Sequence, residues 1–388
     1  MPLSSYPLTW LHNAPTPNQM EFFQALAKAP DVKLRVLHCC SYSDTRPFSL
    51  GNPWLAEPDL AFRHDVLKGF NLLRRRDFYI NPGIVSAVLT SSKRELWLAH
   101  GHTIPTIQAA MWLLNLRRIP WILVSEPPNL RTAFRDFVRD LLLLPCRMGA
   151  KGVIVYGSRR RARYFSRFFP SDRIFVTPQY QNLSPLLSIQ RDSAFNGAQR
   201  GRPIRYFYAG RLEPFSGVDL LIRAFNRLAL KYEDVELGIL GGGSQRAYLE
   251  RLVLEKIKSR VVFHGVVPRE SVPAVFARGD IFVHPNHGQG WGMAVNEALA
   301  AGMPVIASKV IGAAEELVLD GANGFLLERP DDEDGFYQRM EFYAQSRNRL
   351  PEFIANARKT ADRISLDKGV AEFLGILDQI LQRPEPDS

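Results

Sequence analysis

His284-Pro-Asn-His-Gly-Gln-Gly-Trp-Gly-Met-Ala-Val-Asn-Glu-Ala-Leu-Ala-Ala-Gly-Met-Pro-Val-Ile-Ala-Ser308 is the segment from which the fold can be inferred. The apolar run 281–283 predicts a buried strand, and the glycine-rich loop 288–292 allows a positive φ or a close approach to a ligand. A short helix is expected from about Met293 to Ala301, followed by Gly302, where a C-cap glycine is typical, and then by a second strand. A strand, a glycine loop, a helix and a strand in this order indicate an α/β fold.

The loop and the helix after it suggest a ligand site. Backbone N–H groups at a helix N-terminus attract anions, and Glu297 lies one turn inside the expected helix. One interpretation is a site for a nucleotide diphosphate, with a carboxylate nearby for hydroxyl groups. The other is a glycine-rich α/β connection with a glutamate on the surface. This stretch alone does not separate the two.

Length and composition indicate a soluble globular protein of two or more domains. The chain has 388 residues, of which 46% are hydrophobic and 23% charged, and no apolar run is long enough to span a bilayer. Met1–Trp10 lacks the features of a signal peptide, so a cytoplasmic protein is expected. The cysteines, Cys39, Cys40 and Cys146, include no CxxC pair, which argues against a disulfide framework or a zinc site.

The net charge of +10 suggests an anionic partner. Lysine and arginine are densest in the first half, and the basic segment 131–147 also carries apolar residues. Such a segment can contact an anionic membrane surface, contact nucleic acid, or form a solvated helix face. Because no nucleic-acid recognition motif is present, we expect no nucleic-acid partner and take an anionic membrane surface as the leading hypothesis.

Strands alternate with helices along both halves of the chain, which predicts an α/β fold with parallel sheets. The polar segment 186–203 is expected to be a linker between a domain over 1–185 and a domain over 204–366. Residues 367–388 are expected to form a helix that packs back toward the N-terminal domain. Residues 41–81 lack a regular pattern and are interpreted as an insertion.

Several polar or glycine-rich positions follow expected strands of the second domain. Ligands of open α/β sheets bind at the carboxyl ends of strands, so Arg211 and the loops at Gly241 and Gly288 should converge. A guanidinium at Arg211 could fork onto diphosphate oxygens, whereas the alternative is a surface arginine. Ser216 has the spacing of a helix N-cap, which we favour over a catalytic role.

Four further residues carry possible chemistry. Glu297 could accept hydrogen bonds from a ribose diol, and Gln289 could bond a sugar hydroxyl but cannot act as a base. His100 and His102 follow a strand of the first domain, where a histidine could bond a donor sugar or tune the reacting oxygens. The alternative is a pair of structural or pocket-lining histidines. No Asp-x-Asp pair suited to a metal and no Walker A motif is present.

A series of short motifs between Arg205 and Phe325 resembles the retaining glycosyltransferases of family GT4, which have the GT-B fold. The first domain is similar in a looser way, so the resemblance covers nearly the whole chain. The motifs, in order, are Gly210-Arg211-Leu212, Gly217-Val218-Asp219-Leu220, Val262-Phe263-His264-Gly265, Gly290-Trp291-Gly292, Asn296-Glu297-Ala298 and Ala301-Gly302-Met303-Pro304-Val305-Ile306.

The resemblance implies two Rossmann-like α/β/α domains that face each other across a cleft, with the acceptor on the N-terminal domain and the nucleotide sugar on the C-terminal one. By matching position, Arg211 would bind the diphosphate and Glu297 the ribose. The loop and first turn, Gly290, Trp291, Gly292, Met293 and Ala294, would serve the phosphates or the donor sugar. His100 would approach the donor sugar, with His102 as its neighbour. The family implies retention of configuration and no metal or other cofactor.

Two positions depart from the family pattern. Ser216 stands where the family usually has a lysine, and Gln289 stands where it has the first glutamate of a Glu-x7-Glu motif. Both changes remove charge from the expected donor pocket, one of each sign. An altered donor pose, a different donor sugar or a nearby cation such as Arg246 or Lys309 could compensate.

The sequence therefore predicts a hexosyltransferase-type glycosyltransferase (EC 2.4) that uses a nucleotide-diphosphate sugar. Its acceptor is expected to be a glycan or a lipid-linked molecule, in the synthesis of cell-surface polysaccharide, lipopolysaccharide or glycolipid. The protein would be cytoplasmic, with peripheral contact to the inner face of the plasma membrane, and its oligomeric state is left open. The alternatives are a degenerate glycosyltransferase-like binding protein and another GT-B enzyme, such as a sugar-nucleotide epimerase or a phosphorylase.

Overall fold

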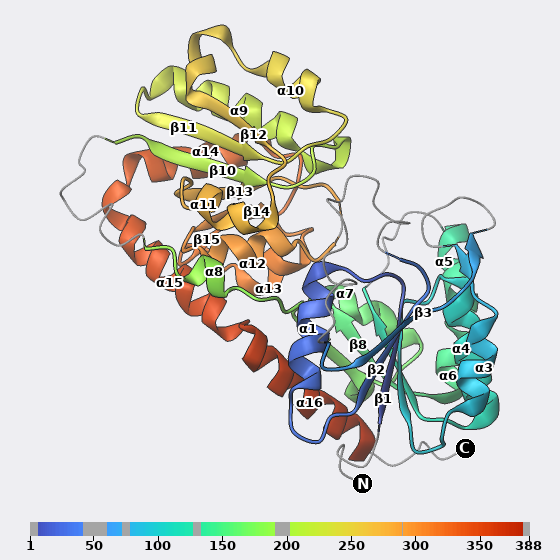
Figure 1. Cartoon of the computed structure of the whole chain (residues 1–388). Helices are drawn as coiled ribbons and strands as arrows, with labels where there is room; N and C mark the ends of the chain where they lie inside the picture. Colours follow the sequence, from blue (N-terminus) through green and yellow to red (C-terminus); the bar gives the residue numbers. More distant parts are fainter. Residues whose placement is uncertain are drawn as a thin grey trace. The chain divides into compact units, whose positions relative to one another are not determined.

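The structure is a computed structural model of the chain that describes residues 7–41, 60–71, 78–126, 133–190, 202–288 and 290–382. Gln289 lies outside the described residues, as do a few side chains inside α5 and α7. The chain forms two compact units (Figure 1). Unit 1 contains Met1–Asn182 and Leu366–Ser388, and unit 2 contains Leu183–Ser365.

Unit 1 is built on a parallel sheet of seven strands in the order β3-β2-β1-β6-β7-β8-β9. Most of its strands are runs of apolar residues that are buried on both faces, as parallel sheets require. The strands are β1 (Leu8–His12), β2 (Leu34–His38), β3 (Arg63–Val66), β6 (Leu96–His100), β7 (Trp121–Ser125), β8 (Ala150–Tyr156) and β9 (Ile174–Thr177). A separate antiparallel pair joins β4 (Phe70–Asn71) to β5 (Tyr79–Ile80).

Helices cover both faces of this sheet because successive strand residues point to opposite sides. Trp10 faces a core that it shares with α1 (Pro17–Ala27) and α16 (Leu366–Gln382). Its neighbour Leu11 faces a second core on the opposite side. The helices that build this second core are α3 (Gly83–Thr90), α4 (Pro105–Arg117) and α6 (Leu144–Gly149). Two more helices of unit 1 are α5 (Ala133–Leu142) and α7 (Arg159–Ala162).

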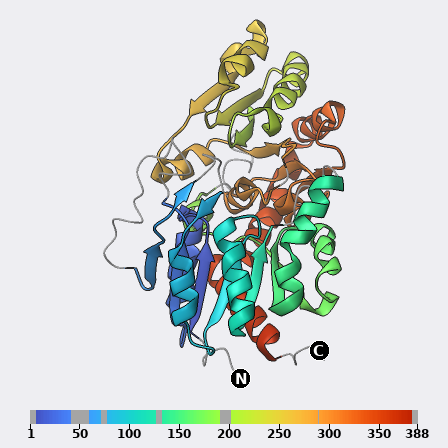
Figure 2. The same ribbon diagram turned by 90° about the vertical axis from the view of Figure 1, so that its right-hand side faces the viewer.

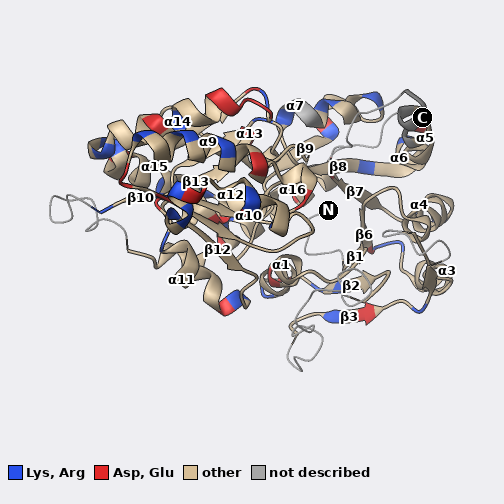
Figure 3. Cartoon of the chain, turned by 90° about the horizontal axis from the view of Figure 1, so that it is seen from above, with Lys and Arg blue, Asp and Glu red and all other residues tan. Residues whose placement is uncertain are grey.

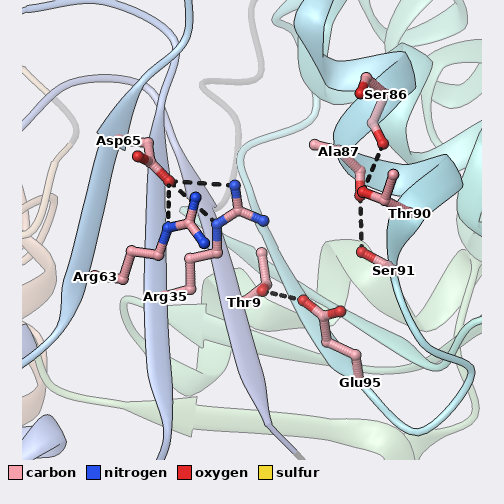
Figure 4. A network of polar contacts seen from close by, with 9 residues as sticks. All are labelled: Thr9, Arg35, Arg63, Asp65, Ser86, Ala87, Thr90, Ser91 and Glu95. Atoms are coloured by element: carbon pink, nitrogen blue, oxygen red, sulfur yellow. Dashed lines mark hydrogen bonds and ion pairs between the residues drawn. The ribbon is translucent and has the colours of Figure 1, made fainter.

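The edge strand β3 lies inside the stretch 41–81, for which no regular element was predicted. It carries few apolar residues because it is paired on one side only, with β2. Asp65 holds the edge together by accepting hydrogen bonds from Arg35 on β2, at 3.2 Å, and from Arg63, at 3.1 Å (Figure 4). In the same view, the Thr9 hydroxyl donates to Glu95, which joins β1 to the start of β6.

Unit 2 has a parallel sheet of six strands in the order β12-β11-β10-β13-β14-β15. Its strands are β10 (Ile204–Ala209), β11 (Val235–Leu240), β12 (Val261–Gly265), β13 (Ile281–His284), β14 (Val305–Ser308) and β15 (Gly324–Leu327). Its helices are α8 (Ser184–Leu187), α9 (Val218–Lys231), α10 (Arg246–Leu252), α11 (Val272–Phe276), α12 (Met293–Ala300), α13 (Gly312–Leu317), α14 (Glu333–Gln345) and α15 (Leu350–Arg363). They pack on both faces and form two cores.

Two sheets of parallel strands, each covered by helices, confirm the predicted fold class of two Rossmann-like α/β/α halves. Unit 2 begins at Leu183, which is buried with Leu186 in its core. The last helix, α16, belongs to unit 1, although unit 2 separates it in sequence from the rest of that unit. No helix among the described residues is long and apolar enough to cross a membrane.

Candidate functional site

Three loops meet at the carboxyl edge of the sheet of unit 2. They follow β10, β11 and β13, which are adjacent strands of this parallel sheet. Leu212 donates its N–H to the carbonyl of Gly242 at 2.9 Å, and His287 donates its N–H to the carbonyl of Phe215 at 2.8 Å. The structure thus brings together the Arg211, Gly241 and Gly288 loops, as expected for loops at the carboxyl ends of strands.

Glycine is required where the first two loops touch. The φ angle of Gly241 is 136°, and a Cβ atom at this position would lie 1.9 Å from the carbonyl oxygen of Gly210. A side chain here would therefore both strain the backbone and separate the loops.

Arg211 is exposed, and its guanidinium lies 4.8 Å from the ring centroid of Phe215. The ring supports the planar group by a cation–π contact without using its N–H donors. Within the part of the chain that the structure describes, no carboxylate forms an ion pair with Arg211. Its five donors are therefore available to an anion.

Ser216 is 1% exposed, and its hydroxyl donates to the carbonyl of Arg211. The predicted N-cap role is wrong, because the N-cap of α9 is Gly217, whose φ of 66° is left-handed. Ser216 instead ends a short turn that begins at Glu213, and Glu213 accepts a hydrogen bond from the Ser244 hydroxyl at 2.6 Å. The serine thus shapes the Arg211 loop from within.

Helix α12 begins at Met293 after Gly292, whose φ is 88°. The carbonyls of Gly290 and Trp291 accept hydrogen bonds from the start of α13, at 3.0 and 2.7 Å, which fixes the loop against that helix. The amides of Met293 and Ala294 lie in the first turn, where a helix offers them no carbonyl partner. Together with the positive end of the helix dipole, they make this end of α12 suitable for a phosphate.

Only one strip of α12 reaches the surface. Met293, Ala294 and Glu297 are half-buried, whereas the other five residues of the helix are buried. Spacings of one and four residues place these three on one side of the helix, so the carboxylate of Glu297 lies one turn from the free amides. Trp291 is buried and donates from Nε1 to Asn296 at 3.1 Å, which ties the loop to the helix.

Two histidines that were not predicted as site residues precede the glycine loop. His284 is 4% exposed and stacks between Tyr208, at 5.8 Å, and Phe282, at 5.5 Å. Burial lowers the pKa of His284 to about 4, so its ring is neutral at physiological pH. The Nε2 atom of His287 lies 3.0 Å from the position that a Cβ atom of Gly217 would take, at the start of α9. Both histidines belong to the segment 284–308, and their position close to its glycines could have identified them from the sequence.

The two cations suggested as substitutes for the missing lysine are already paired. Arg246 donates from Nε to Glu250 at 2.8 Å, and Lys309 forms an ion pair with Glu328. His287 is therefore a further candidate for a second donor beside Arg211.

In unit 1, His100 and His102 lie at the carboxyl end of β6. His100 belongs to a cluster of four histidines from adjacent strands, with His12 on β1, His38 on β2 and His64 on β3. The rings of His12 and His100 are 4.2 Å apart, and Nδ1 of His38 lies 2.8 Å from Nε2 of His64. Burial lowers the pKa of each of the four, to about 4 for His12.

His102 is buried beside this cluster, and its Nδ1 lies 3.1 Å from the hydroxyl of Ser125 at the end of β7. His100 and His102 were predicted from the sequence as candidates, whereas His12 and His38, which also end apolar strands, were not. No group of three or more His, Cys, Asp or Glu residues in the described ranges could hold a metal ion.

Comparison with known proteins finds similar glycosyltransferases. Residues 190–360 match the family described as glycosyl transferases group 1. The chain is 32% identical, over 53% of its length, to a GDP-mannose-dependent alpha-(1-6)-phosphatidylinositol monomannoside mannosyltransferase of Mycolicibacterium smegmatis. It is 28% identical, over 61% of its length, to a D-inositol 3-phosphate glycosyltransferase of Xylanimonas cellulosilytica. The matches span 54% and 59% of these two relatives, so the chain covers little more than half of their length.

Solved structures share the fold over almost the whole chain. Anabaena Alr3699/HepE in complex with UDP superposes with a TM-score of 0.70 at 19% identity, covering 95% of this chain and 99% of that one. Sucrose-phosphate synthase from Thermosynechococcus elongatus gives a TM-score of 0.70 at 19% identity, covering 97% and 99%. With the two parallel sheets, these findings show that the chain has the GT-B fold and that residues 190–360 match the group 1 glycosyltransferases, in agreement with the resemblance to family GT4.

Proposed function

We propose that the protein transfers a sugar from a nucleotide-diphosphate donor to a hydroxyl group of an acceptor. The observation that carries this proposal is the convergence, at one sheet edge of unit 2, of an exposed arginine, a helix N-terminus and a half-buried carboxylate. These are Arg211, the start of α12 and Glu297. The first two suit a diphosphate and the third suits a diol, which are the two polar parts of a nucleoside diphosphate.

In the proposed reaction, the bond between the anomeric carbon and the diphosphate oxygen breaks while a bond to the acceptor oxygen forms. The acceptor proton passes to the leaving diphosphate. Negative charge grows on that diphosphate in the transition state, and Arg211 and the amides of Met293 and Ala294 are placed to stabilise it. Glu297 would hold the ribose. Attack from the same face as the leaving group would give the retention that the family resemblance implies.

For three residues the proposal rests on the resemblance. We propose that His100, with His102 beside it, bonds the donor sugar, and that Gln289 bonds a sugar hydroxyl. No metal or other cofactor enters this proposal, since Arg211 and the helix amides are placed to neutralise the diphosphate. The buried Ser216 contributes by shaping the Arg211 loop.

The names of the relatives support a hexose donor and a lipid-linked or glycan acceptor. One relative is a GDP-mannose-dependent mannosyltransferase of phosphatidylinositol monomannoside, and structures of Anabaena Alr3699/HepE contain UDP and UDP-glucose. We therefore propose a GDP- or UDP-hexose as donor, and a role in cell-surface polysaccharide, lipopolysaccharide or glycolipid synthesis. The proposed location is the cytoplasm, with peripheral contact to the inner face of the plasma membrane.

A panel of UDP, GDP and ADP, and of their sugars, tests the proposal by thermal shift and by donor hydrolysis. We expect one nucleoside diphosphate to raise the melting temperature and its sugar to be hydrolysed slowly in the absence of acceptor. Stabilisation without turnover, with or without added glycan and lipid acceptors, would instead support a nucleotide-binding scaffold. Turnover that leaves the nucleotide bound to an altered sugar would support an epimerase. If no nucleotide stabilises the protein, the proposal fails.

A further inference from the structure

The outer surface of α3, α4, α5 and α6 in unit 1 is unusually apolar. Nine of the eighteen large apolar side chains that are exposed among the described residues lie on these four helices. Single exposed leucines are common in soluble proteins, but a concentration of this kind marks an interaction surface. The nine residues are Val85, Leu89, Trp112, Leu116, Phe137, Val138, Leu141, Leu144 and Met148.

Each of the four helices contributes a pair of these residues spaced by four positions. The pairs are Val85 with Leu89, Trp112 with Leu116, Phe137 with Leu141, and Leu144 with Met148. Residues four apart lie on one side of a helix, so each helix presents a continuous apolar strip to solvent.

These strips share one face of unit 1. Helices α3, α4 and α6 lie on the same face of the sheet, and α5 packs against α6. Their inner sides already supply the core, through residues such as Val88 on α3, Met111 on α4 and Cys146 on α6. Figure 2 views unit 1 with these helices in front of the sheet. The exposed strips are therefore a second apolar surface, which we call the outer helix face.

A row of cations borders this face at the C-terminal ends of the helices. Lys93 and Arg94 follow α3, Arg117 and Arg118 end and follow α4, and Arg147 lies in the last turn of α6. Each helix leads into the amino end of the next strand of the parallel sheet, so all five cations lie toward one end of the unit.

Acidic side chains are few on this face. Helices α3, α4 and α6 contain no Asp or Glu, and Figure 3 shows α3 and α4 free of red segments. On α5, Asp140 is held by Arg167 and Tyr164. The cations beside the outer helix face are therefore not neutralised by carboxylates of these three helices.

Three of the exposed apolar side chains stand beside these cations. Leu116, which is 81% exposed, directly precedes Arg117, and Met148, which is 65% exposed, directly follows Arg147. Leu89 occupies the same last turn in α3, ahead of Lys93. Apolar side chains flanked by cations that form no ion pair within the described residues suit an interface between lipid tails and anionic headgroups.

We propose that the outer helix face is a docking surface for an anionic lipid bilayer. The apolar strips would enter the headgroup region and the bordering cations would contact anionic headgroups. A second copy of the chain fits less well, because its helices α3, α4 and α6 would bring cations but no carboxylates to this face. That docking would present a lipid-linked acceptor to the enzyme rests on the proposed function. The binding to the bilayer does not.

Co-sedimentation with two kinds of vesicle tests the proposal on the full chain. We expect binding to an equal mixture of phosphatidylglycerol and phosphatidylcholine, and at least tenfold weaker binding to phosphatidylcholine alone. The triple variant Leu89→Ser, Leu116→Ser, Met148→Ser should weaken binding at least tenfold. The double variant Arg118→Gln, Arg147→Gln should weaken it about 30-fold, since each cation near an anionic surface contributes about fivefold.

A matched triple variant controls for surface hydrophobicity. Leu230, Leu254 and Leu319 are exposed leucines of unit 2, and their replacement by serine should change vesicle binding less than twofold. Trp112 gives an independent readout, because the other described tryptophans are buried. Vesicles with brominated acyl chains should quench its fluorescence, and the quenching should disappear in Trp112→Phe.

Three results would overturn the proposal. They are absence of binding to anionic vesicles at low salt, equal losses in the control variant, and a dimer that the outer-face variants dissociate while vesicle binding is absent. Nucleotide-induced thermal shifts measured on the same variants separate this inference from the proposed function. Normal shifts without vesicle binding reject the docking surface alone, whereas vesicle binding without any nucleotide shift rejects the proposed function alone.

Discussion

Arg211 is the residue on which donor binding should depend most. Its guanidinium stands exposed over Phe215, and a bidentate, charge-assisted contact to a diphosphate contributes about 1.5–3 kcal/mol. We expect Arg211→Ala to weaken nucleoside diphosphate binding by about 10- to 100-fold without changing the melting temperature of the free protein. Calorimetric titration measures the first effect. Arg246→Ala is the matched control, because Arg246 already pairs with Glu250; equal losses in both variants would remove the phosphate assignment.

His287 should provide a second contact. It lies at the start of α9, in a loop that is hydrogen-bonded to the carbonyl of Phe215, close to the position where the family usually has a lysine. An imidazole N–H can donate to a phosphate oxygen. We expect His287→Ala to weaken binding of the same diphosphate about tenfold and His287→Gln, which keeps an N–H donor, to recover part of the loss. Unchanged affinity in His287→Ala would mean that the serine in place of lysine is not compensated here.

For single residues, the sequence was informative where the role of a residue follows from its place at a strand end or in a helix turn. Arg211 and Glu297 could be placed because strand ends and helix turns follow from hydrophobic periodicity. Ser216 was misassigned because a capping pattern cannot show that Gly217 takes the N-cap position and that the serine hydroxyl turns inward to Arg211. His284 and His287 were missed because the role of a histidine depends on its neighbours from other strands and loops.

Among the elements, the start of α12 depends on one glycine of its loop. A Cβ atom at Gly292, whose φ is 88°, would lie 2.5 Å from Cγ2 of Ile311, whereas a Cβ atom at Gly290 would meet nothing within 4 Å. We expect Gly292→Ala to lower the free energy of unfolding by about 1–3 kcal/mol and to weaken donor binding, because the first-turn amides would move. Gly290→Ala should be close to neutral in stability. Urea unfolding and nucleotide titration of the two variants check both expectations.

Gly321→Ala separates backbone strain from steric overlap. Gly321 has a φ of 76° but open space around its Cα atom, and it lies outside the candidate site. This variant should lose stability while keeping nucleotide affinity. If it weakened nucleotide binding as much as Gly292→Ala, the effect would not be specific to α12.

The histidine cluster at the carboxyl ends of β1, β2 and β6 should make unit 1 sensitive to acid. The folded-state pKa values of His12, His38 and His100 are lowered by burial, so the unfolded chain binds these protons more tightly than the folded one. Stability is therefore full above the unfolded pKa of 6.5 and falls as the pH drops from there toward 4, by up to about 1.4 kcal/mol per pH unit for each histidine.

Urea unfolding between pH 7.5 and pH 4.5 measures this dependence. His38→Gln should give a shallower slope than the natural protein, because one buried group no longer takes up a proton on unfolding. The slope is the informative quantity, since the substitution also changes the stability at neutral pH. An unchanged slope would show that His38 does not contribute.

Strand β3 and helix α4 show what the sequence could and could not predict about single elements. Strand β3 was missed because an edge strand is paired on one side, and its sequence Arg63-His-Asp-Val66 alternates too weakly to be recognised. Helix α4 follows the expected alternation of strands and helices, but periodicity could not show that it lies on the outside of unit 1 with Trp112 and Leu116 exposed. Exposure depends on which faces its neighbours cover.

For the whole molecule, the alternation of strands and helices predicted both sheets, because each βαβ unit is a local pattern. The order of strands within each sheet, and the face that each helix covers, depend on contacts between segments distant in sequence. Helix α16 is such a case: it follows all of unit 2 in the chain, yet Phe373 stacks on Trp10 of β1 at a centroid distance of 5.2 Å. Phe22 of α1 contacts the ring of Phe373 edge-on, at a centroid distance of 5.4 Å.

This placement makes the last helix a structural part of unit 1, and a matched pair of variants tests it. Phe373 and Phe353 are both fully buried, the first in unit 1 and the second in unit 2, where it contacts Tyr343 at 5.2 Å. We expect each replacement by alanine to cost about 3–5 kcal/mol, because each leaves a cavity. Hydrogen exchange should accelerate in β1 and β6 for Phe373→Ala, and in β10 and β14 for Phe353→Ala. Because each unit has its own cores, the other unit should keep its protection; acceleration of unit 2 in Phe373→Ala would show that α16 also stabilises that unit.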